Sequence, residues 1–363
     1  MMTDNTDTLW EIEPHTQTKH EILRRYLGAW FTILGSRFSR IVYIDGFCGP
    51  GRYKGGEDGS PIIALQVAKS QPLIAKSDVT FLFIDQRRDR INHLESILST
   101  ICSPKNFHVE CKVNEFENTL TELLDTYGRD GHQIAPTFAF IDPFGFKGAP
   151  FSLIERLLSN PSTEVFITIM FRDINRFITH PNPAESQHIK GLLGATDQEI
   201  DQVINSTDRL LAFKQLYQNK LHTCARFVRF FEMHDKQNNL LYVLFFASNH
   251  HLGHKKMKEV FWKVDCQSGF KFSDRTDPNQ LVLFGLDPSF DLAKGLATRY
   301  KGTTRKTDDI YGYVDNETAF VESHARKALR KLEIDNEIIV DPIKSDGTKR
   351  KKGTFPKEVV IHF

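Results

Sequence analysis

The sequence predicts an α/β protein with a mostly parallel, doubly wound sheet that ends in an antiparallel hairpin and is followed by a smaller domain. Three observations support this fold class. Short apolar or β-branched runs alternate with helical patterns in the first half of the chain. Two later apolar runs flank the polar segment HDKQNN, as the strands of a hairpin do. The chain closes with a helical segment, a strand, the basic turn KSDGTKRKKGTF and a last strand, which is the order of a winged helix.

The larger part begins with a helix and then alternates strands with helices. Apolar residues between His15 and Phe38 recur with the 3.6-residue period of an amphipathic helix. The expected parallel strands are residues 41–44, 79–84, 107–113, 137–141 and 165–170, and the clearest helices between them are 61–69, 89–99 and 151–158. The hairpin strands are 226–233 and 240–247. Five parallel strands closed by an antiparallel pair are typical of class I methyltransferases, whereas a Rossmann dehydrogenase sheet usually stays parallel.

Length and composition fit two domains. The 363 residues, 40% hydrophobic and 26% charged, are enough for one large core and a smaller one. We predict a Rossmann-like methyltransferase domain over residues 1–285, in which the polar stretch 173–225 is a helical insertion, and a winged-helix domain over residues 286–363. Because the formal net charge is only +1, any nucleic-acid contact must come from local basic patches.

Several classes of protein are disfavoured by the composition. No apolar run approaches the length of a membrane span, and the polar start MMTDNTDTLW lacks the apolar core of a signal peptide, so we expect a cytoplasmic protein without membrane contact. The five cysteines are scattered and form no C-x-x-C pair. We therefore expect reduced thiols and neither a disulfide framework nor a metal site.

The segment IVYIDGFCGPGRYKGG carries the strongest local signal for a ligand. An apolar strand ends in Asp45, and the following turn contains Gly46, Phe47, Gly49 and Gly51 before a helix. Glycines allow a close approach of backbone to ligand, and a helix N-terminus offers free N–H groups. The spacing matches neither the dinucleotide fingerprint nor the P-loop. We predict a nucleotide-like ligand here, and the alternative is a tight structural turn.

The next two strands end in polar residues that suit an adenosine. Asp85 ends the second strand about 40 residues after Asp45, where a carboxylate can accept hydrogen bonds from both ribose hydroxyls. Asn114 and Glu115 follow the third strand, where either of them can meet the adenine edge. The alternative for each of them is a solvated strand end.

The fourth strand delivers the candidate catalytic residues in the segment TFAFIDPFGFKG. Asp142 and Pro143 lie at the carboxyl edge of the sheet, where open α/β sheets place their ligand crevice. A strand-end carboxylate and the carbonyl beside a proline can hold an exocyclic amine for methyl transfer, and Phe144 or Phe146 can stack on a flipped base. The alternative is an Asp-Pro turn with core phenylalanines.

Two basic groups are candidate substrate contacts. After the fifth strand, Arg172, Asn175 and Arg176 share one side if a helix begins there, and they can hold a phosphate. The basic turn of the C-terminal domain contains the run Lys349, Arg350, Lys351 and Lys352. The alternative for the first group is a solvated surface, because surface arginines are common. The alternative for the second group is a winged helix that contacts protein.

Several motifs together resemble the three-Cys-motif partner (TcmP) family over almost the whole chain. They are TKHEILRRYL, YIDGFCGPGRY, GSPIIAL, FIDQ, FIDPFG, NRF, SNHHLGHKKMKEVFWKVDCQSGFKFSD and RKKGTFP. The resemblance implies a Rossmann-type methyltransferase with S-adenosyl-L-methionine as cofactor, a C-terminal winged helix and a radical-S-adenosylmethionine-like partner that bears three cysteines. It also adds Lys19 and His20 as substrate-binding residues. The family's first motif has alanine where this chain has Cys48, and both residues are small.

A second, shorter resemblance suggests the substrate. FIDPFG is similar to the D-P-F-G motif of tRNA guanine-N2 dimethyltransferases, which act on an exocyclic amine. We therefore predict a methyltransferase that acts on a base amine of RNA or DNA. The alternative is a catalytically silent adaptor subunit that binds nucleic acid or protein in a mobile-element or phage-related system.

Overall fold

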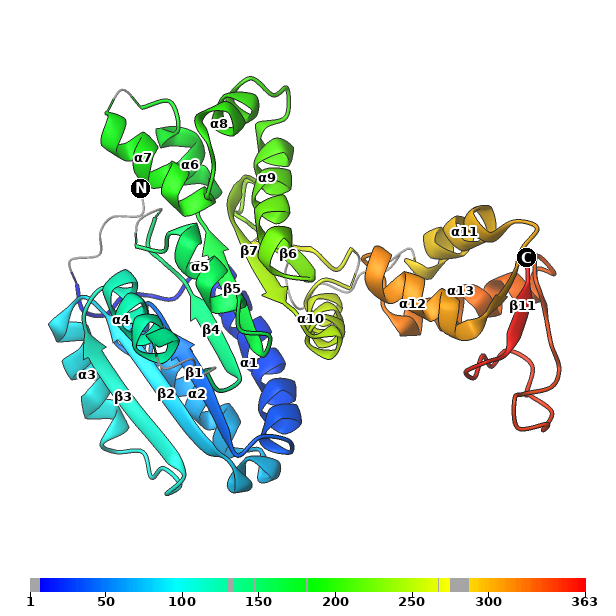
Figure 1. Ribbon diagram of the computed structural model, residues 1–363, viewed down its shortest axis with the longest axis horizontal. Helices are drawn as coiled ribbons and strands as arrows, with labels where there is room; N and C mark the ends of the chain where they lie inside the picture. Colours follow the sequence, from blue (N-terminus) through cyan, green and yellow to red (C-terminus); the bar gives the residue numbers. More distant parts are fainter. Residues whose placement is uncertain (1–6, 130–133, 146–147, 181, 267, 275–286) are drawn as a thin grey trace. The chain divides into compact units, whose positions relative to one another are not determined.

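The computed structural model describes residues 7–129, 134–145, 148–180, 182–266, 268–274 and 287–363 (Figure 1). The chain forms two compact units. The first consists of residues 1–260 with 271–276, and the second of residues 261–270 with 277–363. Within the described ranges, no helix is both long and apolar enough to cross a membrane.

The first unit is built on one sheet with the strand order β3-β2-β1-β4-β5-β7-β6-β8. The strands are β1 (Arg40–Asp45), β2 (Asp78–Asp85), β3 (Phe107–Val113), β4 (Thr137–Ile141), β5 (Thr163–Ile169), β6 (Phe227–His234), β7 (Leu240–Ser248) and β8 (Lys271–Ser273). Strands β1 to β5 pair in parallel, and β7 is antiparallel to both β5 and β6. The predicted Rossmann-like sheet with an antiparallel hairpin is confirmed.

The hairpin is not the last element of the sheet, as the sequence had suggested. Strand β8 pairs in parallel with β6 and forms the outer edge. It has only three residues, all of them half-buried, so it carries no alternation of apolar and polar side chains that could announce a strand.

Helices cover both faces of this sheet (Figure 1). They are α1 (Pro14–Gly35), α2 (Ser60–Lys69), the 3₁₀ helix η1 (Pro72–Lys76), α3 (Arg88–Leu98), α4 (Phe116–Arg129), α5 (Phe151–Leu158), α6 (Phe171–Phe177), α7 (Pro183–Leu193), α8 (Asp197–Ile204), α9 (Arg209–Cys224) and α10 (His251–Val264). Helix α1 starts with a proline at its first position and buries the predicted apolar stripe, including Leu23, Leu27 and Phe31. Helices α4, α5, α7 and α9 share one apolar core with the opposite face of the sheet.

Helices α6 to α9 occupy the stretch between β5 and β6. Three of them begin at side chains that cap the helix: Asn182 for α7, Thr196 for α8 and Asp208 for α9. Thr196 forms a capping box with Glu199. Their apolar faces join the core of the sheet, so this segment packs as part of the first unit.

The second unit contains α11 (Ser289–Tyr300), β9 (Thr304–Lys306), α12 (Thr307–Glu317), α13 (Glu322–Ile334), β10 (Ile339–Val340) and β11 (Val360–His362). Its three strands form an antiparallel sheet in the order β10-β11-β9. Leu296, Ile310, Leu329 and Ile361 are fully buried in a separate apolar core. This core gives the unit its own source of stability.

Candidate functional site

The sheet places the two strand-end acids Asp45 and Asp142 at its topological switch point. Strand order reverses between β1 and β4, which are hydrogen-bonded neighbours with Asp45 paired to Phe140. The N–H of Gly46 donates to the carbonyl of Phe140 at 2.9 Å, so the chain leaves both strands at the same edge. Open α/β sheets bind their ligands at such an edge.

Asp142 is held from the other side by Lys19 of helix α1. The Lys19 Nζ donates to Asp142 Oδ2 in a partly buried ion pair, and it also lies 5.1 Å from the ring centre of Tyr242. Within the part of the chain that the structure describes, Asp142 Oδ1 has no hydrogen-bond partner, and the Asp142 side chain is 22% exposed. One carboxylate oxygen is therefore fixed and the other is available to a ligand.

Asp45 is fully buried beneath this pair. Burial raises its pKa to about 7, a hydrogen bond with Ser60 opposes the shift, and the charge of Asp142 adds to it. The backbone N–H of Phe47 donates to Asp45 Oδ1 at 3.4 Å. Asp45 thus titrates near neutral pH and accepts a hydrogen bond from the glycine turn. Because its side chain is fully buried, it has no surface that a bound ligand can contact.

Three side chains around the ion pair, His20, Tyr53 and Tyr242, are uncharged at pH 7. Burial, and then the charge of Lys19, lower the pKa of His20 to about 3, so this imidazole is uncharged at pH 7. Burial raises the pKa values of Tyr53 and Tyr242, and Asp142 raises both further. Because these neighbours are buried and uncharged, they screen the attraction between Lys19 and Asp142 less than water would.

A second pair, His15 and Asp274, was not singled out from the sequence. His15 Nδ1 lies 3.1 Å from Asp274 Oδ2, and the Tyr242 hydroxyl donates to the His15 carbonyl at 3.2 Å. Burial lowers the pKa of His15, but hydrogen bonds with Glu13 and Asp274 outweigh it and the net shift is upward. In the sequence, the one feature that could have pointed to His15 is its position one helical turn before Lys19.

Two of the three predicted ligand glycines are explained by packing inside the protein. A Cβ on Gly46 would lie 2.5 Å from the Phe116 ring, and one on Gly51 would lie 2.6 Å from Leu94 Cδ1. Gly51 also has a φ of 81°. Phe47 packs on the same Phe116 ring at 5.5 Å. At Gly46 and Gly51, packing inside the protein is enough to explain why the residue is a glycine.

Asp85 holds the glycine turn onto the second strand. Its carboxylate accepts hydrogen bonds from the backbone N–H groups of Gly49 at 3.1 Å and Arg87 at 2.8 Å, and it lies 3.6 Å from the Arg90 guanidinium. Asn114 is exposed at the adjacent strand end and donates its backbone N–H to the Asp85 carbonyl. The predicted cofactor residues of β2 and β3 therefore lie together, with Asp85 already bonded to backbone.

The N-terminal segment lies across this turn, which sequence reasoning missed. The Trp10 carbonyl accepts from Lys54 N–H at 2.9 Å, and the Trp10 ring makes edge contacts with Tyr53 at 5.7 Å and Phe144 at 5.8 Å. The Arg90 guanidinium lies 5.0 Å from the Trp10 ring and 5.2 Å from that of Phe144. Phe144, predicted to stack on a base, is 55% exposed beside this cluster. In the sequence, the only indication of this contact is that Trp10 is a single tryptophan in a polar segment.

The remaining candidates of the first unit lie where their strands end. Pro143 is buried directly after Asp142, and Phe146 lies outside the described residues. Arg172, Asn175 and Arg176 lie on α6, which starts right after β5, and all three are exposed. Their spacing places them on one helical face at the carboxyl edge of the sheet.

In the second unit, the basic run divides into two kinds of residue. Lys349, Lys351 and Lys352 are exposed. Arg350 is buried, and its guanidinium pairs with the Glu333 carboxylate and donates to the Asp341 carbonyl at 2.9 Å. Arg350 is therefore not part of an exposed basic surface, contrary to the prediction, because a buried carboxylate and backbone carbonyls occupy its donors.

No cluster of potential metal ligands occurs among the described residues. The five cysteines are free, and Cys48 is buried. Burial raises the pKa of the Cys48 thiol well above its ordinary value, which makes it a poor nucleophile.

No family model and no curated protein sequence matches this chain. Solved structures align with it at low similarity. The bifunctional kinase-methyltransferase WbdD has 13% identity and a TM-score of 0.35 over 66% of this chain and 40% of WbdD. Trm1 from Pyrococcus horikoshii, in complex with S-adenosyl-L-methionine, has 10% identity and a TM-score of 0.35 over 72% of this chain and 62% of Trm1. An O-methyltransferase from Bacillus cereus has 11% identity and a TM-score of 0.33 over 66% of this chain and 82% of its own.

This chain thus spans less than half of WbdD. The TM-scores are too low for these superpositions to assign residues or substrates. Assignment of the fold rests on the strand order and on the antiparallel β7 beside β5.

Proposed function

We propose that this chain is an S-adenosylmethionine-dependent methyltransferase that acts on a base amine of nucleic acid. The proposal rests mainly on the position of Asp142 and on the hydrogen bonding of its two carboxylate oxygens. It lies at the switch point of the sheet, one carboxylate oxygen is fixed by Lys19, and the other has no partner among the described residues. A carboxylate oriented in this way can accept a hydrogen bond from an amine N–H and so direct the nitrogen lone pair toward an electrophile.

The residues at the ends of β1, β2 and β3 fit the chemistry of the cofactor. Gly49 brings backbone close to the site, Asp85 offers a carboxylate, and Asn114 offers an exposed amide. In S-adenosylmethionine, the amino-acid part would contact Gly49, the ribose would contact Asp85 and the adenine edge would contact Asn114. Trp10 and Arg90 lie beside Asp85, so entry of an adenosine requires the N-terminal segment to shift or to stack on the base.

Within the proposed site, each residue has one task. The cofactor supplies a methyl group activated by its sulfonium. Asp142 accepts one N–H of the acceptor amine, and the carbonyl of Pro143 offers a second acceptor. Lys19 positions Asp142 and keeps it from turning away, and the exposed ring of Phe144 can stack on the base. The proton displaced from the nitrogen passes to water, which reaches the partly exposed Asp142.

The second unit supports a nucleic-acid substrate. Its element order of helix, strand, two helices and two strands matches that of a winged helix, in which α13 would be the recognition helix. Lys349, Lys351 and Lys352 are free to contact phosphates in the loop between β10 and β11. We further propose that the chain acts together with a three-Cys-motif protein, and that it is cytoplasmic, where free thiols persist.

Calorimetric titration with S-adenosylmethionine and S-adenosylhomocysteine, followed by transfer of a labelled methyl group to RNA and to DNA, tests the proposal. We expect Asp142→Asn to bind cofactor within about threefold of the wild type and to lose transfer by about 100-fold or more. Asp201→Asn, an exposed change on α8, is the control. If the wild type binds no cofactor even with the three-Cys protein present, the adaptor alternative takes its place.

A further inference from the structure

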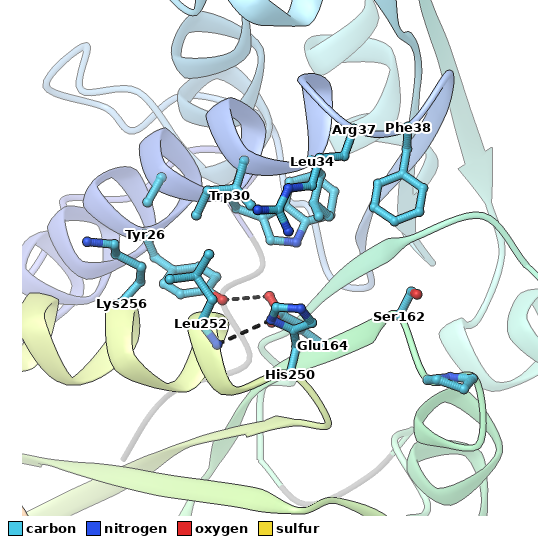
Figure 2. A pocket seen from close by; sticks show the side chains of 14 residues that line it. Tyr26, Trp30, Leu34, Arg37, Phe38, Ser162, Glu164, His250, Leu252 and Lys256 are labelled. Atoms are coloured by element: carbon cyan, nitrogen blue, oxygen red, sulfur yellow. Dashed lines mark hydrogen bonds between the residues drawn. The ribbon is translucent and has the colours of Figure 1, made fainter. Parts of the chain in front are cut away.

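A small cavity lies near the amino end of the parallel strand β5, whereas the candidate site lies at the carboxyl ends of the parallel strands. Figure 2 shows the side chains that line this cavity. It is bordered by the second half of α1, the start of β5 and the start of α10. Its volume is about 100 Å³, somewhat below that of an engineered cavity of roughly 150 Å³ that binds benzene. The cavity can therefore take one small ring or a short branched chain.

The walls of this cavity are mostly apolar. Tyr26, Trp30 and Leu34 contribute from α1, and Leu252 faces them from α10 (Figure 2). Glu164 lies at the inner end, where its carboxyl accepts from the Tyr26 hydroxyl at 2.5 Å and from the Ser248 hydroxyl at 2.8 Å. Apolar walls favour an apolar body in the ligand, and the existing hydrogen bonds of Glu164 leave it little need for another donor.

Two donors on the α1 side lack acceptors. Trp30 is 3% exposed, and its indole Nε1 is buried without a hydrogen-bond partner. Arg37 is exposed at the cavity mouth, and among the described residues its guanidinium has neither an ion pair nor a side-chain hydrogen bond. Lys256, the other cation of the lining, is already paired with Glu259 at 2.8 Å. A buried N–H without an acceptor is costly, and an unpaired guanidinium beside an apolar cavity favours an anion.

We propose that this cavity binds a small monocarboxylic acid with a single ring or short alkyl body, whose carboxylate accepts from Arg37 and from Trp30 Nε1. Benzoate is the probe that represents this class. The inference is independent of the proposed methyl transfer, because no residue of the cavity belongs to the candidate site.

Glu164 explains why a singly charged ligand is favoured over a phosphate. Burial raises the pKa of Glu164 to about 7, so the carboxyl is only partly ionised at neutral pH. A dianion in the same small cavity would meet stronger repulsion from the ionised fraction than a carboxylate does. Inorganic phosphate is therefore the discriminating second probe.

The indole N–H signals of the ¹⁵N-labelled full chain provide a direct test, since the sequence has three tryptophans. Benzoate should shift the Trp30 signal saturably, with a dissociation constant of about 1 mM or lower, and should leave the Trp262 signal in place. Trp262 Nε1 already donates to the Ala319 carbonyl at 2.7 Å. Trp30→Phe assigns the signal.

Variants and analogues separate anion recognition from simple filling of an apolar space. Arg37→Gln should weaken benzoate binding about tenfold or more, whereas Arg40→Gln, an exposed change outside the cavity wall, should leave it within about twofold. Ala29→Leu, which adds volume at the lining, should abolish binding. Benzyl alcohol and phosphate should each bind at least about tenfold more weakly than benzoate.

Any one of four results would overturn the proposal. They are no saturable shift of the Trp30 signal up to about 20 mM benzoate, equal affinity for benzyl alcohol and benzoate, unchanged affinity in a folded Arg37→Gln protein, and tighter binding of phosphate than of benzoate. Circular dichroism checks whether each variant is folded, and the wild-type titration decides the question without any variant.

Discussion

Lys19 and Asp142 are 123 positions apart in the sequence, and their side chains form a partly buried ion pair at the carboxyl edge of the sheet. The lysine comes from the first turns of α1 and the aspartate from the end of β4. The pair ties the helix to the strand end and determines which oxygen of Asp142 remains available. Stability and the proposed chemistry therefore depend on the same contact.

Lys19→Gln should lower methyl transfer about 100-fold, because Asp142 loses the group that orients it. Cofactor affinity should change by less than about threefold. The free energy of unfolding should fall by about 1–3 kcal/mol, less than for a fully buried pair because Asp142 is partly exposed. Urea unfolding and transfer kinetics measure both effects, with the exposed Lys54→Gln as control. Unchanged stability would show that the ion pair contributes nothing.

Asp85→Asn should weaken cofactor binding about tenfold or more. The amide keeps one acceptor oxygen for the turn but removes the charge that faces Arg90, and charge-assisted bonds are worth about 1.5–3 kcal/mol. Asp78→Asn, at the other end of the same strand, serves as the control. Calorimetry with S-adenosylhomocysteine gives the affinities, and equal values for Asp85→Asn and wild type would remove Asp85 from the site.

Trp10 should report on cofactor binding through its fluorescence. An adenosine at Asp85 has to disturb the packing of Trp10 on Arg90 and Phe144, so titration with S-adenosylhomocysteine should change the emission. Trp10→Phe should abolish that change, whereas Trp30→Phe should retain it. Should the signal persist in Trp10→Phe, the N-terminal segment does not take part in binding.

Because of Glu164, the free energy of unfolding should fall as the pH rises from 5 to 8. Its pKa is about 7 in the folded protein against 4.5 ordinarily, so the folded state holds a proton that the unfolded chain releases at lower pH. The stabilising contribution is complete below pH 4.5 and is lost as the pH passes 7, by about 3 kcal/mol in total. Asp45, with a pKa of about 7 against 3.8, acts in the same direction.

Glu164→Gln removes the first of these two contributions. Urea unfolding at pH 5, 6, 7 and 8 should show a shallower decline than in the wild type. Glu155→Gln, an exposed change on α5, should leave the decline as it is. A wild-type stability that does not fall over this range contradicts the prediction.

Arg350 and Lys351 should behave differently although they are neighbours. Arg350→Met leaves the Glu333 carboxylate buried without its cation and should destabilise the second unit by about 3 kcal/mol. Lys351→Met should change stability by less than about 0.5 kcal/mol. If nucleic acid binds here, Lys351→Met should reduce the slope of log affinity against log salt by about 1. Equal loss of stability in both variants would contradict the assignment.

The sequence predicted the sheet well because its inner strands are continuous buried runs. Strands β1 and β2 each end in an aspartate and β4 is followed by one, which is why Asp45, Asp85 and Asp142 were identified as strand-end residues. Parallel pairing then brings these three to one edge without further information. Strand β8 was missed because three half-buried residues carry no periodic pattern.

Side-chain partners were beyond the reach of the sequence pattern. The resemblance marked Lys19 as a substrate contact, but its bond to Asp142 depends on where α1 crosses the sheet. Trp10 precedes every predicted element, so nothing in the pattern placed it beside Arg90. In the basic run, charge alone did not reveal that one side chain points inward while its neighbours remain in solvent.

Helix α1 extends from the candidate site to the cavity near the amino end of β5. Its 22 residues span about 33 Å, with Lys19 near the start and Arg37 just beyond the end. One helix therefore carries residues of both places, and we expect benzoate in the cavity to change cofactor affinity at the candidate site. Thermodynamic linkage requires the reverse effect to be of equal size. The ratio of cofactor affinities measured with and without benzoate would give that coupling free energy directly.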